Sequence, residues 1–123
     1  MSAVNTDTGA LLLGVGATVS QNTFDLTNVD SRGLKLFVNM SLVGTGSITV
    51  TVQGKDPTSG TYYTILASAA IVANGFTTYT VYPGAPVTAN ASVNDILPRT
   101  WRVLATANNA NPANYTVSGC LVV

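Results

Sequence analysis

The feature that most limits what this chain can fold into is an alternation of apolar and polar side chains that recurs along its length. The clearest example is residues 48–53, with the sequence Ile-Thr-Val-Thr-Val-Gln, and residues 11–19 and 34–42 repeat the pattern. A period of two is typical of half-buried β-strands, in which Ile and Val face a core and Thr faces solvent. No stretch of helical length shows a helical period with capping residues. The sequence therefore predicts an all-β protein.

Turn-forming sequences rich in Gly, Pro, Asp and Asn separate the predicted strands. About eight strands joined in this way predict a two-sheet antiparallel β-sandwich, either jelly-roll or immunoglobulin-like, with a closed barrel as the less favoured alternative. The Ala-rich residues 67–73 are the one place for a helical turn, and Ile71 and Val72 disfavour it. The predicted strands are residues 11–19, 34–42, 48–53, 61–67, 76–82, 100–107 and 115–123, with short pairing segments around 23–26 and 91–96.

The length of 123 residues fits one domain. Residues 1–10 are polar and unpatterned, so they are predicted to form an N-terminal arm, disordered when free or docked on a neighbour. Residues 11–123 are predicted to form the single β-sandwich domain. Cys120 is the only cysteine, so no disulfide forms within one chain, and its apolar neighbours predict a small buried side chain.

The composition removes most catalytic chemistry. The chain has no His and no Glu, and its five Lys and Arg balance five Asp. Proton transfer, nucleophile activation and metal binding near neutral pH draw mainly on the missing groups. We therefore expect no enzyme and no cofactor, and no catalytic, cofactor-binding or metal-binding residue is predicted. A structural or binding module is expected, and the residues that bind its partner are left unidentified.

The charge pattern also limits the partners and the location. No basic run is present to hold a phosphate backbone, so no nucleic-acid partner is expected. No stretch approaches the ~20 apolar residues of a membrane span, so no membrane partner is expected. The first residues lack the basic region of a signal peptide. The protein is expected to be made in a cytoplasm and to stay there, or to leave by lysis or within a particle.

The segment Lys-Asp-Pro-Thr-Ser-Gly at residues 55–60 predicts a hairpin turn. Pro57 fixes φ at the second turn position, and the Asp56 side chain can bond the backbone two residues on. Gly60 permits a positive φ where the chain re-enters the sheet. A cation or sugar site on Asp56 is the less favoured alternative, because calcium sites usually need more than one carboxylate.

Aromatic and cationic residues give the other candidates. Trp101 is predicted to lie in the core, with Val103 and Ala105 on its face. Arg99 and Arg102 are predicted to bond loop carbonyls or an Asp such as Asp95. A subunit contact is the second choice, and a clamp for a carboxylate or phosphate is a further alternative. A glycan-stacking platform is disfavoured, because Tyr62 and Tyr63 point to opposite faces and at least one is expected in the core. The tyrosines weighed for that platform are Tyr62, Tyr63, Tyr79, Tyr82 and Tyr115.

Several of these segments together resemble a group of small virion structural proteins of tailed bacteriophages. The segments are Gly-Leu-Lys-Leu-Phe-Val-Asn at 33–39, the hairpin over 44–66, Tyr-Pro-Gly at 82–84, Leu-Pro-Arg-Thr-Trp-Arg-Val at 97–103 and Asn-Tyr-Thr-Val-Ser at 114–118.

The resemblance implies a virion protein, and most closely a capsid decoration (cement) protein. Such a protein binds the outer surface of the phage head, partners the major capsid protein and itself as a homotrimer, and stabilises the head. A head-fibre or tail module that binds a host receptor or glycan is the alternative. No functional residues are shared across such families, so none is transferred. The N-terminal arm and an exposed sheet edge are the expected contact elements.

Overall fold

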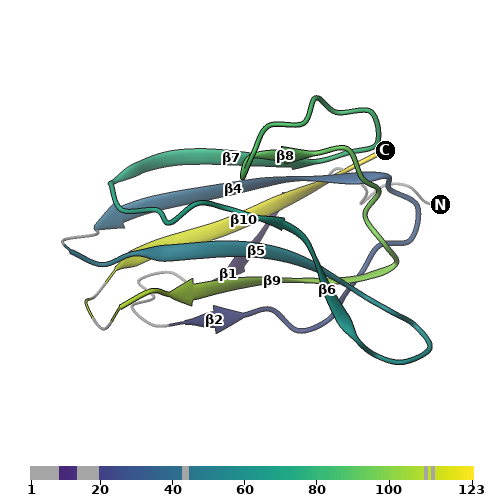
Figure 1. Ribbon diagram of the computed structural model, residues 1–123, viewed down its shortest axis with the longest axis horizontal. Coiled ribbons are helices and arrows are strands. Elements are labelled where there is room, and N and C mark those ends of the chain that lie inside the picture. Colours follow the sequence, from purple (N-terminus) through teal and green to yellow (C-terminus); the bar gives the residue numbers. More distant parts are fainter. Residues whose placement is uncertain (1–8, 14–19, 43–44, 110, 112) are drawn as a thin grey trace.

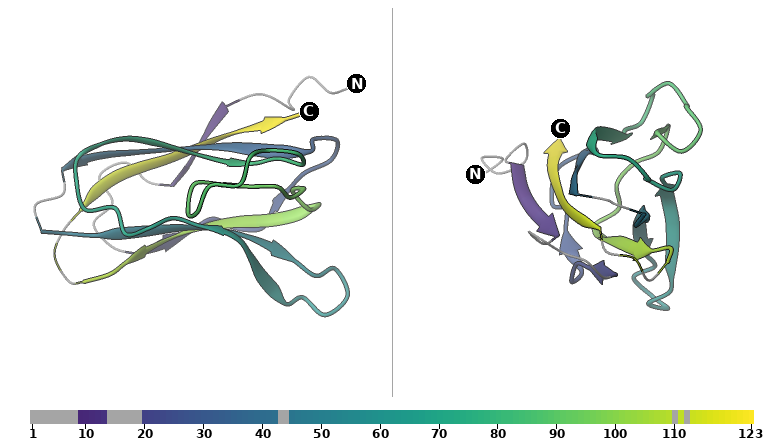
Figure 2. Two further views of the ribbon diagram at one scale, coloured as in Figure 1. Left: turned by 45° about the horizontal axis from the view of Figure 1, so that its top comes forward. Right: turned by 90° about the vertical axis from the view of Figure 1, so that its left-hand side faces the viewer.

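The computed structural model describes residues 9–13, 20–42, 45–109, 111 and 113–123. Within these residues the chain forms two β-sheets packed face to face and no helix (Figures 1 and 2). The predicted all-β sandwich is therefore confirmed. One sheet, in spatial order, contains β1 (Gly9–Leu13), β10 (Asn114–Val122), β4 (Gly33–Leu42), β7 (Gly75–Val81) and β8 (Ser92–Val93). The other contains β2 (Gln21–Asn22), β9 (Thr100–Ala107), β5 (Ile48–Lys55) and β6 (Tyr62–Ala67), with β3 (Leu26–Thr27) also paired to β9.

The strand order separates the two topologies that the sequence left open. Every pairing is antiparallel except the short contact between β7 and β8. If β2 and β3 count as one interrupted strand and β8 is set aside, the order is β1-β10-β4-β7 in one sheet and β2/β3-β9-β5-β6 in the other. This is the double Greek-key order of a jelly roll. An immunoglobulin-like fold would pair its first two strands in one sheet.

The predicted alternation places the core. Along β5 and β9 the residues alternate between buried and half-buried positions, and Trp101, Val103 and Ala105 all face inward as predicted. Each large apolar side chain buried in this way contributes about 1.5–3 kcal/mol. The largest fully buried side chains are Tyr115, Leu34, Leu36, Met40, Ile48, Val38, Val52, Val81, Val103 and Val117.

The strand boundaries differ from the prediction near the N-terminus. β1 pairs with β10 from Gly9 onward, so two residues of the predicted arm, Gly9 and Ala10, belong to the sheet. Residues 1–8 and 14–19, which contain the rest of the arm and part of the predicted first strand, lie outside the described residues. The expected pairing around 23–26 splits into β2 and β3. At the break, the Thr23 N–H donates a 2.9 Å hydrogen bond to the Val103 carbonyl, and the Thr23 hydroxyl accepts a 3.0 Å hydrogen bond from the Val103 N–H. The pairing splits because a side-chain oxygen takes the place of a backbone carbonyl.

Two further segments differ from the expected pattern. The segment expected to pair around 91–96 contributes only β8, parallel to β7. Residues 68–74 lead from β6 in one sheet to β7 in the other without a helical turn. Ile71 anchors this crossing by exchanging backbone hydrogen bonds with Ile48, at 2.8 and 3.2 Å. The crossing is therefore attached to the start of β5 before the chain enters β7.

Candidate functional site

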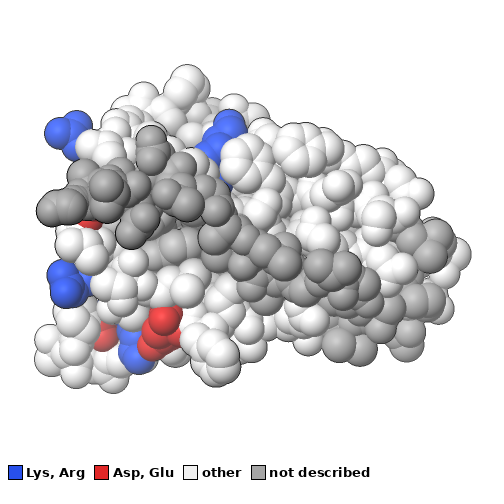
Figure 3. Space-filling model, turned by 180° about the vertical axis from the view of Figure 1, so that it is seen from behind, with Lys and Arg blue, Asp and Glu red and all other residues white. Residues whose placement is uncertain are grey.

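The charged residues gather at one end of the sandwich. Figure 3 shows one face of the molecule, on which the coloured Lys, Arg and Asp side chains lie toward one end and none is seen at the other end. Of the ten charged residues only Asp7 lies outside the described part of the chain. The opposite end, formed by residues 45–47, 68–74 and 106–109, has no charged residue. The nine described charged residues are Asp25, Asp30, Arg32, Lys35, Lys55, Asp56, Asp95, Arg99 and Arg102.

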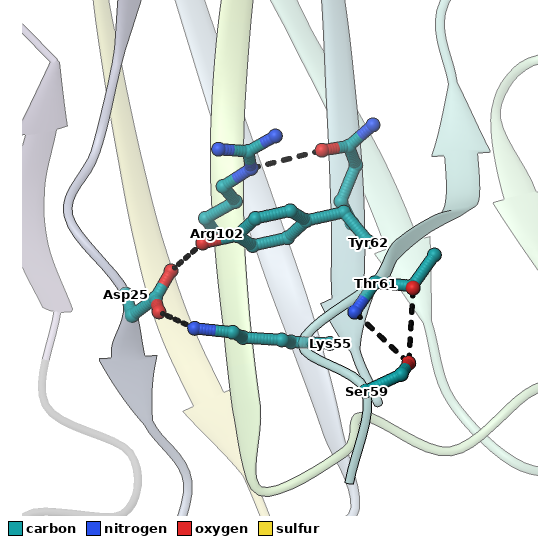
Figure 4. A network of polar contacts seen from close by, with 7 residues as sticks. Asp25, Lys55, Ser59, Thr61, Tyr62 and Arg102 are labelled. Atoms are coloured by element: carbon teal, nitrogen blue, oxygen red, sulfur yellow. Dashed lines mark hydrogen bonds and ion pairs between the residues drawn. The ribbon is translucent and has the colours of Figure 1, made fainter. Parts of the chain in front are cut away.

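A cluster of polar side chains covers the outer face of the second sheet at this charged end (Figure 4). Antiparallel pairing of β5 and β6 places Lys55 opposite Tyr62. Asp25, in the segment between β2 and β3, reaches both of them. Lys55 Nζ lies 2.8 Å from Asp25 Oδ2, and the Tyr62 hydroxyl donates a 2.6 Å hydrogen bond to Asp25 Oδ1. We call these residues, with Gln53 and Arg102, the Asp25 cluster.

Arg102 completes the cluster from β9. Its guanidinium carbon lies 3.4 Å from the centroid of the Tyr62 ring, and its Nε donates a 2.9 Å hydrogen bond to Gln53 Oε1. The Lys55 ammonium lies 5.3 Å from the same centroid. A cation near an aromatic face is attracted by the ring quadrupole, so Tyr62 fixes both cations. Neither terminal nitrogen of Arg102 has a hydrogen-bond partner among the described residues.

The electrostatics of the cluster favour binding over proton transfer. Hydrogen bonds from Lys55 first, and then from Tyr62, lower the pKa of Asp25 below its ordinary value of 3.8. The same bond to Asp25 raises the pKa of Lys55 above 10.5. A carboxylate held in its ionised form by two donors is a weak base near neutral pH. The cluster instead presents two cations, of which Arg102 keeps donors for a carboxylate, a carbonyl or a hydroxyl.

The predicted hairpin turn is confirmed next to this cluster. The Thr58 N–H donates to Asp56 Oδ1 at 3.1 Å and the Ser59 hydroxyl to Oδ2 at 2.6 Å, which lowers the pKa of Asp56. Gly60 has a φ of 75°, the conformation expected of it. Both oxygens of Asp56 thus serve the turn. Among the described residues no group of three or more Cys or Asp side chains is placed to hold a metal ion.

The structure separates the residues of the second predicted motif. Trp101 lies in the core, 3% exposed, as predicted. Its indole Nε1 is buried and has no hydrogen-bond partner among the described residues. The Arg102 side chain bonds Gln53 and Tyr62 rather than a loop carbonyl or Asp95.

The prediction for the paired tyrosines is wrong, because neither enters the core. Tyr62 belongs to the Asp25 cluster, and Tyr63 is 47% exposed beside Gly54. Both lie on the β5–β6 hairpin, which projects past the body of the sandwich (Figures 1 and 2). The core tyrosines are Tyr79 and Tyr115. Cys120 is also less buried than expected, because it lies half-buried on the outer face of β10.

Apolar side chains are exposed at the uncharged end. Phe76 on β7 is 64% exposed and stacks on Phe37 of β4, with ring centroids 6.0 Å apart. Beside it runs an open groove of about 480 Å³. Residues 69–77 line this groove together with Tyr79 and residues 89–91. No local sequence pattern marks this surface or the role of Asp25, because both depend on which strands pair.

Comparisons of the chain with protein-family models, with curated proteins and with solved structures find no match. Within the described residues, no helix is long and apolar enough to cross a membrane.

Proposed function

We propose that this chain is a structural protein of a virus particle, and specifically a capsid decoration protein that binds the outer surface of a phage head and stabilises it. The resemblance of the segments at 33–39, 44–66 and 97–103 to phage virion proteins motivates the proposal. The jelly-roll strand order supports it, because viral capsid proteins commonly use this fold. Lectins use it as well, so the fold alone does not decide between them.

The observation that carries the proposal is the unequal character of the two ends. A decoration protein needs one surface for the capsid protein and another for copies of itself. The Asp25 cluster offers charged donors, with Lys55 and Arg102 held by Asp25 and Tyr62. The opposite end offers an uncharged, apolar strand edge at Phe76. We assign the first surface to the major capsid protein and the second to contacts between copies of this chain.

Copy number in purified particles tests the location. Quantitative mass spectrometry should find hundreds of copies per particle, since a decoration protein occupies repeated positions over the head. A few tens of copies or fewer would assign the chain to the tail or to fibres. Absence from the particles would remove the virion proposal.

Co-sedimentation with undecorated heads tests the surface. Arg102→Ala should weaken binding to heads, and weaken it more at low than at high salt, because contacts of exposed charges are screened. Arg99→Ala is the matched control, since it removes an equal charge from the same end outside the cluster. Equal binding by both variants would contradict the assignment of the Asp25 cluster to the capsid.

A receptor- or glycan-binding tail module is the second candidate. The combination of Tyr62, Arg102 and Asp25 on one surface favours it, because aromatic and hydrogen-bonding groups are used together in recognition. Arg102 lies 3.4 Å over the Tyr62 ring, so that face is not open to a sugar. A glycan array with the purified protein distinguishes the two, and saturable glycan binding without binding to heads would favour the tail module. Neither candidate involves catalysis, and turnover of any substrate would overturn both.

A further inference from the structure

The edge of β7 carries unpaired backbone groups. β7 pairs with β4 over its whole length, whereas β8 covers only Thr80 and Val81. The Thr80 N–H donates to the Ala91 carbonyl on the β8 side, at 3.0 Å. Backbone groups of alternate residues in a strand face the same neighbour, so those of Phe76 and Thr78 also face away from β4. The N–H and C=O groups of both residues have no backbone partner among the described residues.

This edge lacks the features that keep strand edges apart. Natural edges are usually protected by charges, proline, bulges or a covering segment. β7 contains neither a charge nor a proline, and its pairing with β4 runs without a register shift. At the edge of the other sheet, by contrast, the pairing of β6 with β5 shifts between Val52 and Gln53, and the Asp25 cluster flanks it. The edge of β7 is therefore suited to pairing.

An open groove lies beside the edge, lined by residues 69–77, Tyr79 and residues 89–91. Its lining is mostly small, with alanines at positions 69, 70, 73, 89 and 91, and contains no charged residue. Two copies of a neutral edge approach each other without like-charge repulsion. The open part of the edge runs from Gly75, where the chain turns with a φ of 143°, to Tyr79, where the β8 side begins. Thr77 is its midpoint.

We propose that the β7 edge binds the same edge of a second copy of this chain, antiparallel, about a two-fold axis at Thr77. In this register Phe76 of each copy lies opposite Thr78 of the other. Such a pair exchanges two hydrogen bonds, and the two equivalent pairs make four. These bonds use every free N–H and C=O group on both edges. The occupant is a second copy because the open window is symmetric about Thr77, which makes the edge complementary to itself.

The side chains agree with this arrangement. Phe76 is on the outer face, stacked on Phe37, so the pair places the two Phe76 rings diagonally across the joined strands. The contact is isologous, so it closes with two copies and does not propagate into a filament. The surface is small, so the pair dissociates readily in dilute solution and gains strength only where copies are concentrated. This proposal does not depend on the proposed function, because it follows from β7 alone.

Cysteine cross-linking at the proposed axis tests the register. Thr77→Cys in a Cys120→Ser background places two thiols in a directly opposed, non-hydrogen-bonded pair, with Cβ atoms about 4.5–5.5 Å apart. Mild oxidation should convert most of this variant to a covalent dimer. Thr58→Cys in the same background is the matched control, since Thr58 is exposed at the far end, and it should stay monomeric. Equal cross-linking of both variants, or none of the Thr77→Cys protein, would overturn the proposal.

Analytical ultracentrifugation tests the pairing without oxidation. The native chain should pass from monomer to dimer as its concentration rises from ~10 μM to ~1 mM. Phe76→Lys should remain monomeric with an unchanged circular dichroism spectrum, because exposed Phe76 contributes little to the fold and two lysines would meet across the axis. A monomer throughout, or a trimer, would overturn the two-fold pair. Loss of association on deletion of residues 1–8 would also overturn it, because the N-terminal segment would then be the occupant.

Discussion

The two ends of this molecule handle exposed surface in opposite ways. At the charged end, Lys55, Tyr62 and Arg102 are held together by Asp25, and the edge of β6 is broken by a register shift. At the uncharged end, β7 presents unpaired backbone groups and a Phe76 side chain that is 64% exposed. One edge is protected against other strands and the other is open to them. The two edges therefore differ in their protection, and the proposed pairing of β7 rests on this difference.

The largest effects should come from large apolar side chains in the core that both ends share. Leu36→Ala removes a side chain 1% exposed on β4, between β10 and β7. A cavity at such a position costs about 2–5 kcal/mol in the free energy of unfolding. Phe76→Ala on the neighbouring strand should cost less than about 1 kcal/mol, because that ring is exposed. Urea denaturation measures both, and equal losses would show that the outer face of β7 stabilises this sheet as much as the core does.

A smaller effect on stability should come from two closely packed glycines, one in each sheet. A Cβ at Gly33 would collide with the Val81 carbonyl oxygen, a backbone atom that moves only if β4 and β7 separate. A Cβ at Gly54 would meet the Tyr63 ring at 2.5 Å and the Pro98 ring at 2.7 Å, and Tyr63 can rotate into solvent. Gly33→Ala should therefore cost about 1–3 kcal/mol and Gly54→Ala less. Thermal unfolding of both variants checks the order, and the reverse order would contradict this account.

Substitution of Trp101 tests how much the buried indole N–H costs in stability. Within the part of the chain that the structure describes, its buried indole N–H has no partner, which costs free energy that a phenyl ring would not lose. Trp101→Phe sacrifices some packing and removes this cost, so the free energy of unfolding should change by no more than about 1 kcal/mol. Trp101→Ala should lose about 3–5 kcal/mol. A large loss on Trp101→Phe would show that the indole N–H is satisfied in solution.

The smallest effect concerns pH and belongs to the charged end alone. The pKa values of Asp25 and Asp56 are lowered in the folded protein, so their contribution to stability is present above pH 3.8 and is lost as the pH falls toward the folded-state values. Asp25→Asn should flatten the acid limb of a stability curve below pH 4. Both groups are exposed, so the change is small. A curve unchanged by Asp25→Asn would mean that the bonds from Lys55 and Tyr62 do not persist in solution.

The dependence of stability on alkaline pH tests the buried tyrosines of the core in the same way. Burial raises the pKa values of Tyr79 and Tyr115 above 10.0. The neutral phenols therefore contribute fully to the free energy of unfolding below pH 10. This contribution is lost as the pH rises through the pKa values of the folded state. Tyr115→Phe should therefore reduce the loss of stability above pH 10, measured by circular dichroism. An alkaline limb unchanged by Tyr115→Phe would contradict this account.

The alternating sequence alone determined the secondary-structure class, the inward faces of β5 and β9, the core position of Trp101 and the turn at Asp56. These features are local, because a strand's faces follow from its own residues and a turn from four or five neighbours. The tertiary structure decided the jelly-roll order, the exposure of Tyr63 and the open edge of β7. It also joined Asp25 to Lys55 and Tyr62, which lie 30 and 37 residues away. Such contacts depend on which strands pair and which become edges, and that choice is fixed by packing across the whole sandwich.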